Sequence, residues 1–101
     1  MGSPQYGELL LDGVPLSRRI EARSLLWSDD GTRLAAQELV EWYDGPTTCV
    51  VVFDTRTRAR VAESPARDGL DTPLRFETGS LVYRHWHHRA GEREMKLPLP
   101  D

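Results

Sequence analysis

Three histidines and a tryptophan fill four consecutive positions in the segment SLVYRHWHH, residues 80–88. Because side chains two residues apart point to the same face of a strand, His85 and His87 share one face. Such a pair can supply two neighbouring ligands of a zinc ion. Carboxylates would complete the site, and Glu92 and Glu94, beyond an expected hairpin turn at RAGE, are the nearest in sequence.

The rest of the chain gives this metal site little support. There is no other histidine, and Cys49 is the only cysteine, so the remaining ligands would be hard carboxylates on a short turn. It is simpler to interpret Trp86 as a large packing or interface anchor and His88 as a polar residue near a solvated strand end. We therefore predict no metal and no cofactor, with His85 and His87 as the alternative metal ligands.

Other catalytic patterns are absent from the sequence. It contains no GxSxG elbow, no glycine-rich phosphate loop and no paired carboxylates in an apolar frame. Cys49 lies in TTCVVVF, an apolar run typical of a buried small hydrophobe rather than of an activated thiol. We expect a protein that is not an enzyme.

The segment ELVEWYDG is the strongest candidate for a binding surface. Acidic residues flank two aromatics there, as at the centres of many protein interfaces. The alternative, which weighs about equally, is that Trp42 belongs to the core and the acids are its solvated neighbours. The predicted partner-binding residues are Glu38, Glu41, Trp42, Tyr43, Asp44, Trp86 and His88.

Length and composition indicate one soluble domain over residues 1–101. The chain has a mass of 11.5 kDa and a formal net charge of -3, and no apolar stretch is long enough to span a membrane. Neither charge sign forms a block, which argues against a nucleic-acid surface. The N-terminal residues have neither the basic region nor the apolar region of a secretion signal, so we expect a cytoplasmic protein.

Short apolar runs separated by turn signals favour an all-β fold. The turns are expected at DDG, YDGP, TRT, TG and RAGE, and residues 64–73 are expected to be loop. Together they predict an antiparallel meander of about seven to nine strands. A helix near 33–43 is the alternative and would make the fold α+β, because RLAAQELVEWY is rich in helix formers. Strand alternation would instead place one set of residues on a single face: Leu34, Ala36, Glu38, Val40 and Trp42.

One pattern occurs twice along the chain. Trp27 precedes an Asp-Gly turn and a strand, and Phe76 precedes a Thr-Gly turn and a strand. With the run VVVFDTRTRARV, this resembles a blade of a β-propeller over residues 22–63 and, in part, over 73–96. A closed propeller needs at least about four blades, so the resemblance implies hairpin units in an open or packed sheet rather than a ring.

These features indicate a binding protein. The near-exclusive use of arginine over lysine suggests a GC-rich bacterial genome, in which small proteins of this size resemble the immunity proteins of toxin systems. That resemblance implies a cognate protein toxin as partner and assigns no residue. The alternatives are a ligand-binding β-domain and a homodimer joined through edge strands in residues 6–13 and 92–100, although Pro98 and Pro100 oppose the latter.

Overall fold

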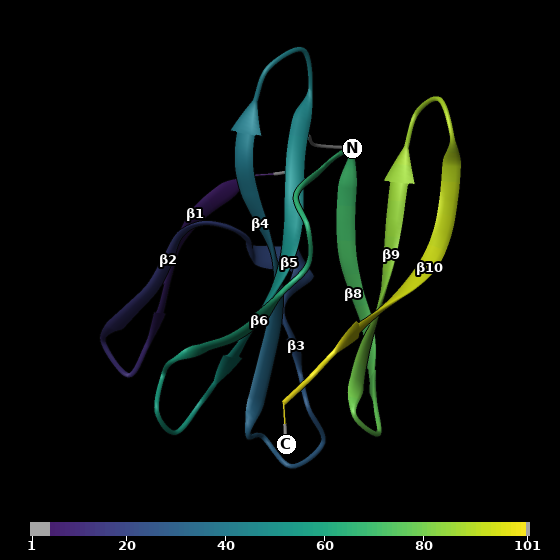
Figure 1. Cartoon of the computed structure of the whole chain (residues 1–101). Helices are drawn as coiled ribbons and strands as arrows, with labels where there is room; N and C mark the ends of the chain where they lie inside the picture. The colour runs from purple at the N-terminus through teal and green to yellow at the C-terminus, as the bar shows by residue number, and fades with distance from the viewer. Residues whose placement is uncertain (1–4, 101) are drawn as a thin grey trace.

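The computed structural model describes residues 5–100 and is built from antiparallel strands, with one short 3-10 turn, η1, at Ala22–Ser24 (Figure 1). The all-β prediction is confirmed. Ten strands occur among the described residues, two of them only two residues long. Their bounds are β1 Tyr6–Leu11, β2 Val14–Glu21, β3 Leu26–Trp27, β4 Arg33–Trp42, β5 Pro46–Asp54, β6 Arg60–Glu63, β7 Arg67–Asp68, β8 Leu70–Glu77, β9 Ser80–His87 and β10 Gly91–Pro98.

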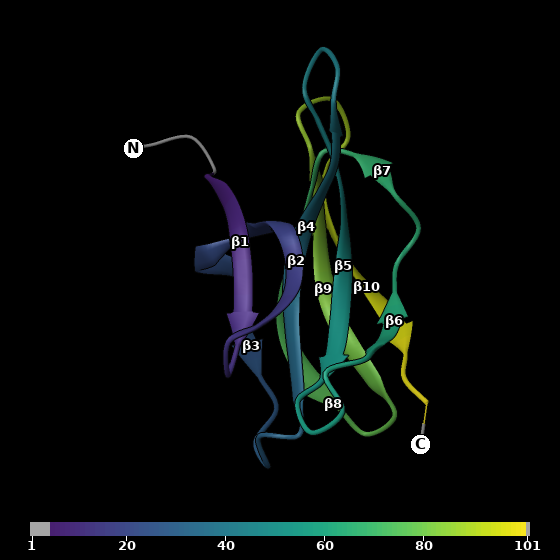
Figure 2. The same cartoon turned by 90° about the vertical axis from the view of Figure 1, so that its left-hand side faces the viewer.

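The strands form two sheets. The seven-stranded sheet has the order β1-β2-β4-β5-β6, with β3 paired to β4 and β7 paired to β5, and the three-stranded sheet has the order β10-β9-β8. Figures 1 and 2 place β4 and β5 between the β1–β2 hairpin and the three-stranded sheet. The expected edge segments 6–13 and 92–100 contain β1 and β10, each at the edge of its sheet.

The hairpin of β4 and β5 is the centre of the molecule because both of its faces are covered. Val50 and Val52 face the three-stranded sheet, where they pack with Leu81 and Tyr83. The alternate residues of β5 face the other way and pack with Ile20, Leu9 and Leu16 of the β1–β2 hairpin. Burial on both faces explains the unbroken apolar run in this strand. The buried apolar residues of β5 are Cys49, Val50, Val51, Val52 and Phe53.

Residues 33–42 are a strand, so the helical alternative is wrong. The expected alternation holds from Leu34 to Glu38, whose partners on β5 are Phe53 and Cys49. A bulge between Leu39 and Glu41 then adds one residue to β4. The sequence predicted that Trp42 shares the face of Glu38. This is wrong, because the extra residue reverses the alternation beyond the bulge. Trp42 instead pairs with Pro46, on the side of the three-stranded sheet.

The expectation of loop over 64–73 is only partly correct, because β7 and the first residues of β8 lie within it. The backbone N–H of Asp71 donates to Oγ1 of Thr48 at 2.9 Å, and its carbonyl accepts from Nε2 of Gln37 at 2.8 Å. These groups point away from β9, towards β4 and β5. Pro73, two residues along, has no N–H on that side. The open edge of β8 is thereby satisfied by side chains of the other sheet.

Gly69 lies in contact with both sheets beside this edge. Its N–H donates to the carbonyl of Pro46 at 2.8 Å, and its own carbonyl accepts from Thr48 Oγ1 at 2.9 Å. Its φ is +110°, and a Cβ at this position would lie 2.2 Å from the backbone oxygen of Trp86. Only glycine fits both the dihedral angle and the space.

We expect Gly69→Ala to destabilise the fold more than Gly79→Ala, which is the matched control. Gly79 also has a positive φ, of +76°, but has no atom within 4 Å of the added methyl group. The control should cost about 1 kcal/mol through backbone strain. Gly69→Ala should cost about 2 kcal/mol more, because the backbone of β9 must move. Urea unfolding measures both, and equal losses would contradict the close packing proposed for Gly69.

Candidate functional site

The tips of two hairpins, one from each sheet, meet at one end of the molecule. The β4–β5 turn and the β9–β10 turn lie at the top of Figure 1, and a pocket of about 300 Å³ lies between them. We call this region, residues 41–46 and 86–89, the aromatic end. The pocket is lined by Tyr43, Asp44, Gly45, Pro46, Asp68, Gly69, Trp86, His87, His88 and Arg89.

Local sequence explains why the aromatic side chains are exposed there. Asp44 and Gly45 both have positive φ, at 57° and 123°, which allows a tight turn. The N–H of Tyr43 donates to the carbonyl of Gly45 at 3.0 Å and closes that turn. Trp42 is 56% exposed, Tyr43 87% and Trp86 43%, so three large rings face solvent near one pocket.

The structure brings together most of the residues predicted for partner binding. Tyr43, Asp44, Trp86 and His88 all line the pocket. Glu41 and Trp42 lie at the same end, in the last residues of β4. Glu38 does not belong to this group, because it lies in the middle of β4 and lines a different pocket. The exposure of Trp42 also rules out the alternative that it belongs to the core.

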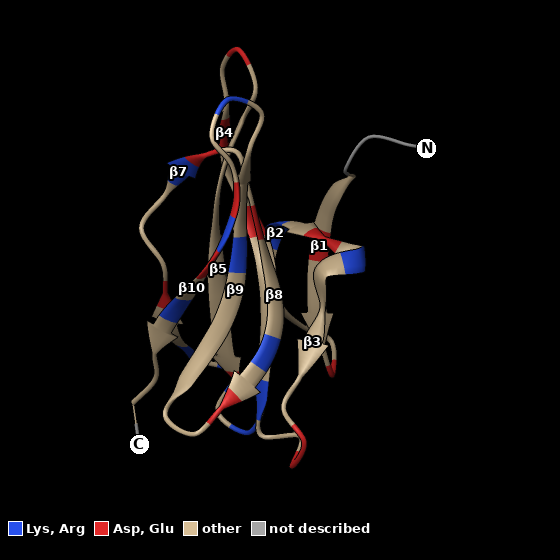
Figure 3. Ribbon diagram, turned by 90° about the vertical axis from the view of Figure 1, so that its right-hand side faces the viewer, with Lys and Arg blue, Asp and Glu red and all other residues tan. Residues whose placement is uncertain are grey.

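The acidic residues of the aromatic end and of its pocket have few partners. Within residues 5–100, the carboxylates of Glu41 and Asp44 form no hydrogen bond or ion pair, and Asp68 accepts one bond, from Thr47 Oγ1 at 2.9 Å. Figure 3 shows acidic residues at the β4–β5 tip and basic ones at the β9–β10 tip. Oppositely charged residues therefore lie near each other without forming ion pairs.

A buried pair of Asp71 and His85 lies just below this pocket. Nδ1 of His85 and Oδ1 of Asp71, whose side chain is fully buried, lie 2.5 Å apart and share a hydrogen bond. Ser64 Oγ lies 3.5 Å from Oδ2. Burial raises the pKa of Asp71 above its usual range, while the bond from His85 acts in the opposite direction. Cε1 of His85 lies 3.4 Å from a Cβ built on Gly69, which lines the pocket.

The sequence did not reveal this pair. Asp71 lies in the stretch that was expected to be loop because it contains prolines and glycines. The stretch nevertheless includes the start of β8, an edge strand, where a proline such as Pro73 is tolerated. Asp71 meets Gln37 and Thr48 only after the sheets have packed. Alternation could have placed Asp71 on a particular face only if residues 70–77 had first been recognised as a strand.

The geometry also argues against the metal site considered for His85 and His87. The carboxylates expected to face this pair, Glu92 and Glu94, pair instead with Trp86 and Arg84 on the other face of β9. Arg93 is the residue opposite His85. In the described part of the chain, no three His, Cys, Asp or Glu residues are grouped as a metal ion requires. His87 stacks on His88 with ring centroids 4.5 Å apart.

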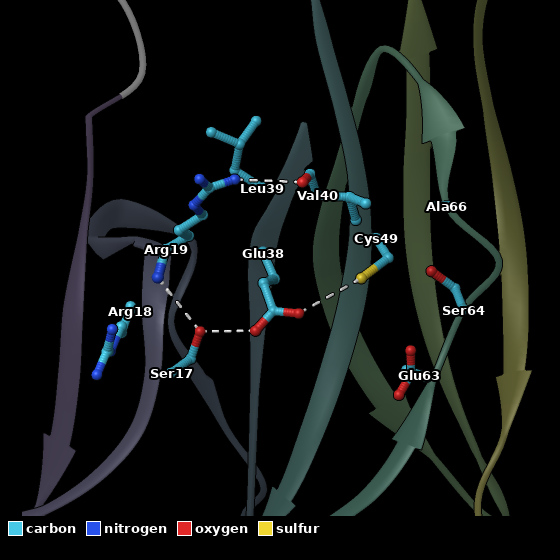
Figure 4. Close-up of a pocket in the computed structure, with 10 residues that line it drawn as sticks. All are labelled: Ser17, Arg18, Arg19, Glu38, Leu39, Val40, Cys49, Glu63, Ser64 and Ala66. Carbon is cyan, nitrogen blue, oxygen red and sulfur yellow. Dashed lines mark hydrogen bonds between the residues drawn. The ribbon is translucent and has the colours of Figure 1, made fainter. Parts of the chain in front are cut away.

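A second pocket, of about 440 Å³, lies over the other face of β4 and β5 (Figure 4). Glu38 points into its centre, where one carboxylate oxygen accepts from Ser17 Oγ at 2.6 Å and the other lies 4.0 Å from the sulfur of Cys49. Arg60 of β6 donates to both oxygens, at 2.8 and 2.6 Å. Such a two-point ion pair fastens β6 to β4 across the intervening strand.

The carboxylate of Glu38 and the thiol of Cys49 are held in unreactive states. Burial, the largest influence on Glu38, would raise its pKa, but the hydrogen bonds from Arg60 and Ser17 together lower it. Burial, followed by the charge of Glu38, raises the pKa of Cys49 to about 12. A thiol in this state is not a nucleophile at neutral pH. The pocket is therefore better explained as part of the packing between β2, β4 and β6 than as a catalytic centre.

No protein-family model, curated protein or solved structure matches this chain. The resemblances to a propeller blade and to immunity proteins therefore remain predictions, and the functional argument depends on the chain's own geometry. In the part that the structure describes, no helix has the length and apolar character needed to cross a membrane.

We expect Asp71→Ala to cost about 3–5 kcal/mol of unfolding free energy, because it leaves a buried histidine and serine without their acceptor. Asp71→Asn should cost less, since its amide oxygen still accepts from His85. Glu92→Ala is the control, because Glu92 forms an exposed ion pair with Arg84 and its loss should cost less than about 1 kcal/mol. Guanidinium unfolding measures all three. Similar losses for Asp71→Ala and Glu92→Ala would contradict the importance of the buried pair.

Glu38 should contribute stability that depends on pH. Because its pKa is lower in the folded chain, its contribution is present above the ordinary value of 4.5 and is lost as pH falls through the folded value. Glu38→Gln should destabilise by about 1–2 kcal/mol at pH 7, and the difference from the natural chain should shrink below about pH 4. Melting curves at several pH values measure this. Glu92→Gln, which removes an exposed acid, is the control, and a difference independent of pH would overturn the assignment.

Proposed function

We propose that this protein is a non-catalytic binding protein that contacts a protein partner with its aromatic end. The observation that carries the proposal is the exposure of Trp42, Tyr43 and Trp86 on two hairpin tips that come from different sheets. Large rings left in water are unfavourable, and they are the residues that dominate the free energy of protein interfaces. Tyr43 and Trp86 line one pocket, which gives a partner a concave surface to fill, and Trp42 precedes Tyr43 at the same end of the molecule.

The scaffold beneath these residues supports a binding role. Gly69 connects the β4–β5 tip to β9 through its bond to Pro46 and its contact with Trp86. The buried Asp71 and His85 pair lies directly underneath. The two tips are thus held in a defined spacing, so the aromatic end loses little conformational entropy when it binds.

The narrower form of the proposal is an immunity protein that binds and neutralises a bacterial toxin. Its support is the small size of the domain, its net charge of -3 and the unpaired acids of the aromatic end. An acidic surface complements the basic cleft of a toxin that acts on nucleic acid or nucleotides, and it speeds association. Blocking such a cleft requires no chemistry from the inhibitor.

Self-association through sheet edges is a weaker second candidate. It is favoured by the position of β1 and β10 at the edges. However, the pairing of β1 with β2 is irregular at two points, and β10 ends at Pro98. Both features hinder the addition of another strand. Analytical ultracentrifugation of the free protein separates the two candidates, because partner binding through the aromatic end does not require a dimer.

We expect Trp42→Ala to weaken the complex by at least about 2 kcal/mol, about 30-fold in Kd, without lowering the melting temperature. The partner to test first is the product of the neighbouring gene, with growth rescue on co-expression as the cellular readout and calorimetry as the binding measurement. Trp27→Ala is the matched control, because Trp27 is 50% exposed on β3, far from the aromatic end.

The control should leave Kd and rescue unchanged. If neither growth rescue nor a complex is found, the toxin proposal is wrong. If a complex forms and both tryptophan variants bind as the natural chain does, the aromatic end is not the contact surface.

A further inference from the structure

The pocket of the aromatic end contains two carboxylates whose hydrogen-bonding capacity is largely unused. Asp44 lies in the β4–β5 turn and Asp68 in β7, and both line the pocket. Within residues 5–100, Asp44 has no hydrogen bond or ion pair through its side chain, and one oxygen of Asp68 has none. Ionised carboxylates accept several hydrogen bonds, so this pocket has free acceptors for a donor supplied from outside.

Carboxylates on the sheets are matched with cations much more fully. The acids that have an arginine or lysine partner include Glu21, Glu38, Glu77, Glu92 and Glu94. Figure 3 shows charged residues of both signs along the three-stranded sheet. Among the described residues, Asp44 and Asp68 of the pocket have no such cation partner.

The arginine that lines the pocket does not fill this role. Arg89 lines the same pocket, but it forms no ion pair within 4 Å with Asp44 or Asp68 in the described structure. It follows His87 and His88, and its backbone N–H is bonded to Nδ1 of His87 at 3.1 Å. The two acids of the pocket outnumber its one arginine, which leaves the pocket suited to a cation from a partner.

We propose, on the basis of the function above, that this pocket receives an arginine side chain of the protein partner. A guanidinium group has donors in a planar fork that match carboxylate oxygens, and its flat face is attracted to aromatic rings such as those of Tyr43 and Trp86. Arginine is also among the residues most enriched at the centres of interfaces. A volume of about 300 Å³ is at the low end for ligand sites, which favours one side chain over a larger molecule.

The test is a titration followed by two-dimensional NMR of the labelled protein. The probe is N-acetyl-arginine N-methylamide, and its neutral match is the corresponding citrulline compound, which has nearly the same shape. We expect the arginine probe to shift the amide signals of Gly45, Gly69 and His87 in a saturable way. The citrulline probe should bind at least about tenfold more weakly, because it lacks the charge that strengthens hydrogen bonds to carboxylates.

Asp44→Asn with Asp68→Asn is the decisive variant. Asparagine tolerates the positive φ of residue 44 and retains an acceptor for Thr47, so the fold should be preserved. Binding of the arginine probe should fall at least about tenfold. Glu8→Gln with Asp29→Asn is the matched control, because it removes the same charge from acids that lie outside the pocket.

The outcomes separate this inference from the proposed function. No saturable shift, equal binding of the two probes, or equal loss in the two double variants would each overturn the arginine pocket. If Trp42→Ala still weakened a protein complex in that case, the binding function would stand without it. If the probe bound as expected but no protein complex depended on Trp42, the pocket would stand and the wider surface would not.

Discussion

The fold depends on one polar connection between its sheets, made by the backbone and side chain of Asp71. The backbone N–H and C=O are satisfied by Thr48 and Gln37 of the other sheet, and the carboxylate is satisfied by His85. Buried polar groups without partners cost several kcal/mol, so these contacts determine how the sheets can pack. The apolar core between the sheets, around Val50 and Leu81, is not directional and would tolerate small shifts.

Gln37 extends this connection to the first hairpin. Its Oε1 accepts from the hydroxyl of Tyr6 at 2.5 Å, while its Nε2 donates to Asp71. Its backbone N–H donates to Ser24 Oγ at 2.8 Å. One side chain in the middle of β4 therefore contacts β1 and β8, which are edge strands of different sheets. The polar contacts of Gln37 and Asp71, with the apolar cores on the two faces of the β4–β5 hairpin, hold this hairpin between the β1–β2 hairpin and the three-stranded sheet.

The same arrangement determines where the molecule can bind a partner. Gly69 joins the two sheets through its bond to Pro46 and its close approach to Trp86, and the hairpin tips project beyond the sheets at this end. Covering both faces of β4 and β5 uses the apolar residues of the strand centres. Trp42, Tyr43 and Trp86 lie outside this covered region, so their exposure cannot be explained by packing within the chain. The acids beside them are also unmatched, which makes this end different from the ion-paired sheets.

Strand alternation, turn residues and composition were enough to predict an all-β fold, the hairpins after residue 22, the two edge segments and the double burial of β5, whereas the β1–β2 hairpin was not predicted. These features depend on neighbours in sequence, such as the Asp-Gly turns and the run from Cys49 to Phe53. Tyr43, Asp44, Trp86 and His88 were also named from the sequence, because hairpin ends expose their residues. The sequence could not show that these residues share a pocket, because two turns more than 40 residues apart meet there only when the sheets pack.

Only the tertiary structure decided the rest. The bulge after Leu39 depends on the partner strand, and it changes the face of Trp42. Arg60 pairs with the carboxylate of Glu38 across an intervening strand, so the pair is not visible in a hairpin pattern. Asp71 pairs with His85 from a segment that was expected to be loop. Sequence periodicity reports which face of a strand is buried, because that depends on alternation alone. Which polar group meets which depends on register and on the distance between sheets, and both are set by packing over the whole chain.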